Sequence, residues 1–228
     1  MPLVLGHAIL TDMWNYGKGS PSFTDSNQTG ANPSVPWSST INIGTASADR
    51  IIIVEASDLD SNTGRTINSV QINGVEMTAL CTVGSGTTAS SWLCALKVTT
   101  GTTATLKVDA GATNSLGAFV WALYGFPRGT WIKQDTVAIS SGGPFTIDKP
   151  INGITFGGGV SAYVNGSAVV GTGITVDGTM VLSTATKRWG GHTTSPSKFN
   201  DYSSTISITN FTGSKNRNTF ATLLPPVA

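Results

Sequence analysis

The spacing most suggestive of chemistry is an acidic stretch over residues 58–64, with the sequence DLDSNTG. Its alternate oxygen-bearing side chains, Asp58, Asp60 and Asn62, would suit a hard cation such as Ca²⁺. The stretch departs from an EF-hand loop, which has Gly at its sixth position and Glu at its twelfth. A polar turn after a strand explains the same residues. We therefore expect a turn, and these three residues form only a weak calcium candidate.

Two histidines, His7 and His192, are too few for a zinc site, which needs three or four clustered ligands. His192 lies in the segment RWGGHTT with no partner close in sequence, so we expect a solvated loop residue. The Gly/Ser-rich segment GSGTTASS lacks the lysine and helix of a phosphate-binding loop. The sequence therefore predicts no metal and no cofactor.

The carboxylates are the remaining candidates for catalysis. A glycosidase would need a facing pair of them, but Glu occurs only at positions 55 and 76, and most Asp residues lie in or beside expected turns. No G-x-S-x-G nucleophile elbow occurs in the chain. We therefore expect no catalytic residue and no enzymatic activity.

Two cysteines, Cys81 and Cys94, are too few for a disulfide scaffold. Both fall on the apolar side of expected strands that could pair as a hairpin. Two buried, reduced thiols are the favoured interpretation, and a cross-strand disulfide is the alternative.

The composition favours an all-β protein. Charged residues make up 11% of the 228 residues, against about 25% in a typical domain, and Gly, Ser and Thr are abundant. The net charge of +1 and the lack of a basic cluster argue against nucleic-acid binding. The chain has no run of 18 apolar residues, so we expect no membrane span. The N-terminal residues lack the basic region of a signal peptide.

Alternating segments from residue 41 onward predict roughly eleven strands at the spacing of a sandwich. The continuous apolar run over residues 50–56 suggests a strand that is covered on both sides. Asn73-Gly74 and Asp177-Gly178 are hairpin turn signals, and Gly157-Gly158-Gly159 suggests a bulge or a close backbone approach. We expect a two-layer antiparallel β-sandwich, jelly-roll-like, over residues 41–228; a division into two smaller sandwiches near residue 127 is the alternative.

Residues 1–40 are expected to form an N-terminal arm. Residues 11–40 show no periodicity but carry four aromatic side chains that a plain linker would not need. We predict that these side chains anchor the arm on a neighbouring subunit: Trp14, Tyr16, Phe23 and Trp37. The alternative is a long loop that folds over its own sandwich.

A second aromatic group lies at the end of the strand expected over residues 174–189 and in the loop that follows it. Sugar sites combine an aromatic face with a few polar groups, and the loop region offers Trp189, His192, Phe199 and Tyr202. These residues are a candidate glycan contact. The alternative is that they cover an open end of the sandwich.

Four runs in the first half carry a resemblance: Arg50–Val54, Ser69–Met77, Val98–Val108 and Ala118–Gly125. Their pattern resembles β-sandwich modules of accessory virion proteins in tailed phages and gene transfer agents. The resemblance covers about residues 46–126 and brings no catalytic residue with it. It implies a decoration or cement protein, a head spike or a tail appendage.

The sequence thus predicts a structural protein of a phage virion surface, which is made in the host cytoplasm without a signal peptide. Its expected partners are capsid or tail subunits and further copies of itself, with no nucleic acid and no membrane. The alternative function is a glycan-binding module of a phage fibre that recognises the host surface.

Overall fold

The computed structural model describes strands β1 to β17 and the residues around them. The described residues are 20–29, 34–59, 66–84, 89–110, 115–125, 130–139, 145–149, 153–163, 169–182, 186–193, 204–209 and 213–224. All strand pairs are antiparallel, which confirms the expected all-β antiparallel sandwich. Within these ranges, no helix is long and apolar enough to cross a membrane.

The strands form four sheets, two from each half of the chain. The first inner sheet contains β1 (Ser20–Gln28), β9 (Ser115–Tyr124), β3 (Ile51–Leu59), β7 (Ala89–Lys97) and β6 (Thr78–Val83), in that order. The first outer sheet contains β2 (Trp37–Asn42), β8 (Thr103–Asp109), β4 (Ser69–Ile72) and β5 (Val75–Glu76).

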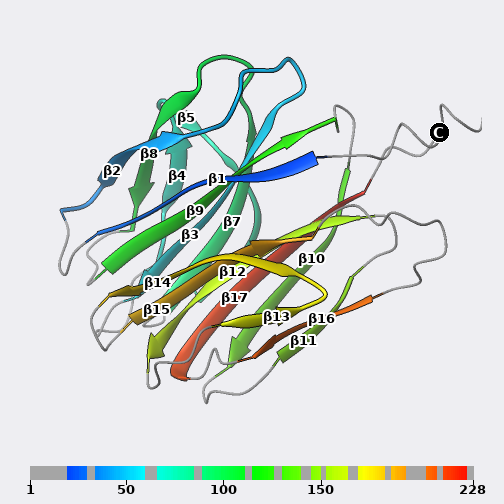
Figure 1. The fold of residues 1–228 in the computed structure, drawn as a ribbon. Coiled ribbons are helices and arrows are strands. Elements are labelled where there is room, and N and C mark those ends of the chain that lie inside the picture. Colours follow the sequence, from blue (N-terminus) through cyan, green and yellow to red (C-terminus); the bar gives the residue numbers. More distant parts are fainter. Residues whose placement is uncertain are drawn as a thin grey trace, which may run out of the picture.

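The second half repeats this plan. The second inner sheet contains β10 (Thr130–Ile139), β17 (Gly213–Leu224), β12 (Ile154–Tyr163), β15 (Thr186–His192) and β14 (Thr175–Leu182). The second outer sheet contains β11 (Phe145–Lys149), β16 (Ser204–Thr209) and β13 (Val170–Thr172). Figure 1 shows the four sheets as successive layers, with the two inner sheets in the middle.

Three apolar cores join the layers. One lies between the first outer and first inner sheets and includes Leu106 and Val54. The next lies between the two inner sheets and includes Trp121 and Phe156. The third joins the second inner sheet to the second outer sheet through Trp189 and neighbouring apolar residues.

Strands β3 and β9 therefore bury side chains on both faces, as the run over residues 50–56 predicted. Val54 faces the outer sheet, while Ile53 faces the other half of the chain. Such strands need no polar side, which explains their continuous apolar sequences.

The two halves share one strand order. If β1 to β4 are matched with β10 to β13, β6 with β14, and β7, β8 and β9 with β15, β16 and β17, the inner sheets have the same order. The outer sheets match in the same way, except that β5 has no separate counterpart. The sequence showed no repeat of fixed period, so the strand order reveals a similarity that side chains conceal. The jelly-roll topology expected for the chain stays a prediction.

The halves also pack in a roughly two-fold manner. β3 contacts its own counterpart β12 at the centre. The contact of β7 with β17 is matched by that of β9 with β15, and the contact of β6 with β10 by that of β1 with β14. Contacts that recur when the halves are exchanged indicate an approximate two-fold axis near the crossing of β3 and β12.

Part of the predicted N-terminal arm belongs to the sheets. Ser20–Gln28 forms β1 and pairs with β9, and β2 begins at Trp37. The sequence SPSFTDSNQ lacks an apolar alternation, because its polar side chains lie at the edge of a sheet. Residues 1–19 and 30–33 lie outside the described residues.

The two hairpin signals had different outcomes. Asn73 and Gly74 have φ values of 51° and 78°, which fits the predicted type I′ turn. The second prediction was wrong, because Asp177-Gly178 lies inside β14, where the pairing register with β15 shifts. A β-bulge inserts an extra residue without reversing the chain.

Both cysteines are buried, reduced thiols, as favoured. Cys81 faces the second half of the chain, whereas Cys94 faces the first outer sheet. A register shift at Leu80 reverses the alternation in β6 and so places the two thiols on opposite faces of one sheet.

Arg50 is a buried charge with a structural explanation. Its guanidinium donates five hydrogen bonds of 2.6–3.2 Å to backbone carbonyls of residues 43, 44, 98, 100 and 101. A guanidinium has five N–H donors in a fixed planar arrangement. One side chain therefore holds the segment that precedes β3 and the segment that follows β7 against each other.

Candidate functional site

The most distinctive polar group of the described residues lies where the two inner sheets meet at one edge. The Oδ2 atom of Asp177 is 2.7 Å from Nδ1 of His192. The same oxygen accepts a hydrogen bond of 2.7 Å from Nε1 of Trp121. Trp121 belongs to the first half and the other two residues to the second, so this polar corner joins the halves.

A β-bulge places the carboxylate. Val176 pairs with Gly191 and Gly178 pairs with Gly190, which leaves Asp177 as the extra residue of β14. Bulges redirect side chains and occur often beside functional sites. The carboxylate is thereby aimed at two ring N–H groups instead of at solvent.

The contact also fixes what His192 presents. A carboxylate only accepts hydrogen bonds, so Nδ1 carries the proton and Nε2 of a neutral ring is an acceptor. Nε2 has no hydrogen-bond partner among the described residues, and the His192 side chain keeps 12% of its surface exposed, against 7% for Asp177. Nε2 can therefore accept a hydrogen bond from a ligand.

Aromatic rings surround the pair. The ring of His192 stacks on Phe156 at 6.3 Å between centroids, and Phe156 meets Trp121 edge to face at 5.8 Å. Phe23 of β1 packs against Trp121 at 6.2 Å. Such contacts hold the rings in fixed positions around the pair.

A second polar group lies at the centre of the interface. Glu55 of β3 is completely buried, and its Oε1 accepts a hydrogen bond of 2.9 Å from Ser91. The Ser91 hydroxyl also lies 2.9 Å from the Thr219 hydroxyl of the other half. Burial raises the pKa of Glu55 to about 8, against the opposing effects of the Ser91 hydrogen bond and the charge of Arg188.

Arg188 crosses the interface in the opposite direction. Its Nη2 donates to the carbonyl and the hydroxyl of Ser115, both at 2.9 Å. Burial lowers its pKa to about 10, although the charges of Glu55 and Asp58 act the other way. Its Nε and Nη1 have no hydrogen-bond partner within the described part of the chain. Glu55 and Arg188 thus form buried polar contacts between the halves, out of reach of outside ligands.

Glycines leave space for large side chains at the interface between the halves. The triple glycine Gly157-Gly158-Gly159 predicted such a close approach. A Cβ at Gly158 would lie 2.7 Å from Cγ of Glu55, and one at Gly190 would lie 2.4 Å from Cγ of Phe119. Both values are shorter than a carbon–carbon contact permits. The close approach at Gly157–Gly159 is therefore confirmed, whereas the register shift in β12 comes later, between Val160 and Ala162.

The strand registers identify the counterpart of the polar corner in the first half. Leu80 is the extra residue of β6, as Asp177 is in β14. Ala95 pairs with Thr78 and Ile53, whereas His192 pairs with Thr175 and Phe156. Trp121 pairs with Ile53, and Ala221 pairs with Phe156, so these two residues are also equivalent. Each residue of the first half thus has a counterpart in the second: Leu80 and Asp177, Ala95 and His192, Thr78 and Thr175, Ile51 and Ile154, and Trp121 and Ala221.

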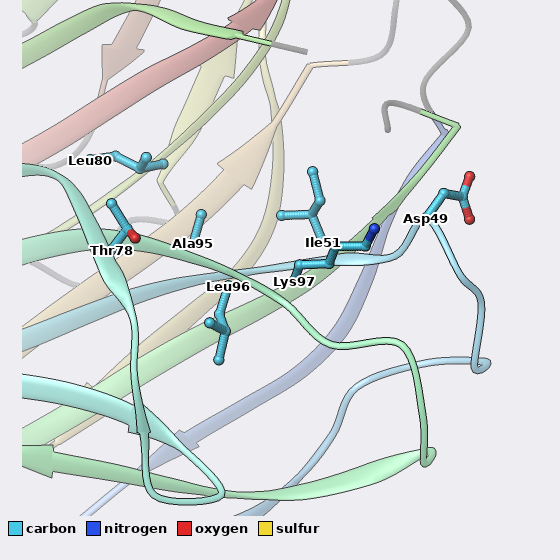
Figure 2. A pocket seen from close by; sticks show the side chains of 7 residues that line it. All are labelled: Asp49, Ile51, Thr78, Leu80, Ala95, Leu96 and Lys97. Atoms are coloured by element: carbon cyan, nitrogen blue, oxygen red, sulfur yellow. The ribbon is translucent and has the colours of Figure 1, made fainter. Parts of the chain in front are cut away.

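This counterpart contains a pocket of about 260 Å³ (Figure 2), which we call the apolar corner. The residues that line it are Asp49, Ile51, Thr78, Leu80, Ala95, Leu96 and Lys97. Thr78, Leu80, Ala95 and Ile51 are the counterparts of Thr175, Asp177, His192 and Ile154. The same place in the fold is thus polar and ring-filled in one half and apolar and hollow in the other.

Two of the four predicted arm anchors lie in the described residues, and both pack on their own chain. Phe23 packs on Phe119 and Trp121 of its own chain, and Trp37 packs against the core of the first outer sheet. Both contacts agree with the alternative of a segment folded over its own sandwich. Trp14 and Tyr16 lie outside the described residues.

The predicted glycan contact changes most. Trp189 is fully buried, donates to Oδ1 of Asn218 at 2.9 Å and packs on Phe220, so no sugar reaches it. The prediction for His192 was wrong, because the residue lies in β15 and pairs with Asp177. The sequence hid this pair because it depends on the unpredicted bulge. Phe199 and Tyr202 lie outside the described residues.

The calcium candidate is only partly described. Asp58 lies within β3 and is buried, not in a loop as predicted. Asp60 and Asn62 lie outside the described residues. In the ranges that the structure describes, no group of three His, Cys, Asp or Glu side chains is placed to hold a metal ion.

Comparison of the chain with protein-family models, with curated proteins and with solved structures found no match.

Proposed function

We propose that this protein is a structural component of a tailed-phage virion surface, acting through contacts with other proteins. The observation that carries the proposal is the packing of two halves with one strand order through equivalent sheets. A fold that packs on a copy of itself inside one chain is suited to assembly. The resemblance of residues 46–126 to accessory virion modules supports the same conclusion.

The surface of the first outer sheet is consistent with this role. Its outward positions carry exposed small polar side chains, including Ser38, Thr40, Asn42, Thr103 and Thr105. Thr40 and Thr105 lie opposite each other in neighbouring strands. The outward positions of β8 also include two charged residues, Lys107 and Asp109. The face of β2 and β8 is therefore mostly uncharged, which allows contact with a capsid or tail subunit with little desolvation of charge.

The partners in this proposal are capsid or tail subunits and further copies of the chain, assembled in the host cytoplasm. Many identical copies on a symmetric particle add weak contacts into stable attachment. Each contact can then remain small.

The proposal is tested on virus particles from cells that produce this protein. Particles purified by density gradient are analysed by quantitative mass spectrometry. We expect the protein to co-purify in a fixed ratio to the major capsid protein and to remain bound after a high-salt wash. Recovery only in the soluble fraction, while other virion proteins stay with the particles, would contradict the proposal.

A further inference from the structure

The apolar corner has the composition of a small binding pocket. Its walls include Leu80, Ala95 and Ile51, and Thr78 adds one hydroxyl. Asp49 and Lys97 lie together at the opposite end from Thr78 and Leu80 (Figure 2). Pockets that bind small molecules combine apolar walls with a few polar groups in this way.

The polar corner shows what occupies the equivalent place in the second half. There the imidazole of His192 stacks on Phe156, and the indole of Trp121 comes from the opposite half. At the equivalent positions the apolar corner has Ala95 in place of His192 and Ala221 in place of Trp121. Of these two alanines, Ala95 lines the pocket, where its methyl group takes the place of the His192 imidazole.

The end of the pocket supplies two opposite charges. The Asp49 carboxylate accepts a hydrogen bond of 2.6 Å from the Gly125 amide and another from Ser47. These hydrogen bonds lower the pKa of Asp49, with a smaller contribution from the Lys97 charge, so the carboxylate stays ionised. Lys97 is exposed and free to turn toward a ligand.

We propose that this pocket binds a small aromatic zwitterion, a molecule with one aromatic ring system and an ammonium–carboxylate pair. The ring occupies the space beside Leu80 and Ala95, where the polar corner has the imidazole of His192. The ammonium group meets Asp49 and the carboxylate meets Lys97. A volume of about 260 Å³ suits a ring system of this size. The inference is independent of the virion role.

The test is isothermal titration of the full chain with tryptophan, phenylalanine and indole. We expect tryptophan to bind and to raise the melting temperature with concentration, because a ligand stabilises the folded state it binds. Indole, which lacks the charged groups, should bind more weakly. No binding by any of the three probes would overturn the proposal, and equal binding of indole and tryptophan would overturn the role of the two charges.

Three variants locate the binding. Ala95→Leu fills the pocket and should weaken tryptophan binding at least tenfold. Lys97→Ala should weaken it about two- to fivefold, the range of an exposed ion pair, while Lys107→Ala on the first outer sheet should have no effect. Binding that survives Ala95→Leu unchanged would overturn the proposal.

A measurement on the wild-type protein tests the same site without relying on the folding of Ala95→Leu. In a methyl NMR titration with tryptophan, the largest shifts should come from Leu80, Ala95 and Ile51. Shifts confined to other methyl groups would overturn the assignment of the site.

Discussion

The polar corner and the apolar corner occupy equivalent places in two halves that share one strand order. Each has a bulged residue, Asp177 in one and Leu80 in the other. The apolar corner shows that this fold does not need an Asp–His pair at that place. The pair is therefore a property of the second half, and it ties Asp177 to Trp121 across the interface.

The centre of the interface shows the same divergence. Glu55 and Gly158 are equivalent by register and face each other near the approximate axis. Two glutamates could not fit there, because the Glu55 side chain occupies the space over Gly158. The two halves thus differ at a place where an exact two-fold axis would force a clash.

The largest expected effect is the dependence of stability on the Glu55 proton. The pKa of Glu55 is about 8 in the folded chain, against an ordinary value of 4.5. Between these pH values the folded chain keeps a proton that the unfolded chain has released, so the free energy of unfolding falls as pH rises from 4.5 to 8. The fall should be on the order of 3 kcal/mol, and Glu55→Gln should remove it.

Urea denaturation from pH 5 to pH 8 measures this slope. Glu76→Gln is the matched control, because the chain has one other glutamate and it is exposed on β5. An unchanged slope in Glu55→Gln would show that Glu55 is not the buried acid described above.

The next effect concerns the space that glycine leaves in the second half. In Gly190→Ala, the new Cβ would lie 2.4 Å from Cγ of Phe119, so the inner sheets must separate locally. The expected loss is about 2 kcal/mol, in the range of overpacked cores. Denaturant unfolding measures it, with Ser38→Ala on the outer sheet as the control; equal stability of both variants would contradict the close packing of the halves.

A smaller effect is expected when the polar corner is made like its counterpart. Asp177→Leu leaves the Trp121 N–H buried without its acceptor, and should cost about 1–2 kcal/mol. Trp121→Phe removes the donor instead. A double-mutant cycle with both changes should show coupling between the two residues, and additive losses would contradict the hydrogen bond across the interface.

The smallest effect is expected in the apolar corner. Ala95→Leu adds apolar atoms to a hollow, and cavity filling commonly raises stability by about 0.5–1 kcal/mol. Thermal unfolding measures the change. A clear loss of stability would mean that the pocket is already filled in solution.

The sequence predicted what depends on local patterns and missed what depends on register. The run over residues 50–56 indicated a strand covered on both sides, and Asn73-Gly74 indicated the turn between β4 and β5. Each of these signals is contained in neighbouring residues. Asp177-Gly178 gave a false turn signal, since a bulge and a turn attract the same residue types. His192 was misplaced for that reason.

The similarity of the two halves escaped sequence analysis for a physical reason. Equivalent positions hold different side chains, such as Glu55 and Gly158 or Trp121 and Ala221. The shape of an interface requires large residues to face small ones, so the two halves diverge most where they meet. The backbone order keeps the similarity that the side chains have lost.

The most direct test of the central claim is cryo-electron microscopy of particles from cells that produce the protein. We expect the four-layer unit on the particle surface, with the two inner sheets in contact and an outer sheet or sheet edge against a neighbouring subunit. Particles whose surface lacks this unit, although the cells contain the folded protein, would contradict a function in virion assembly.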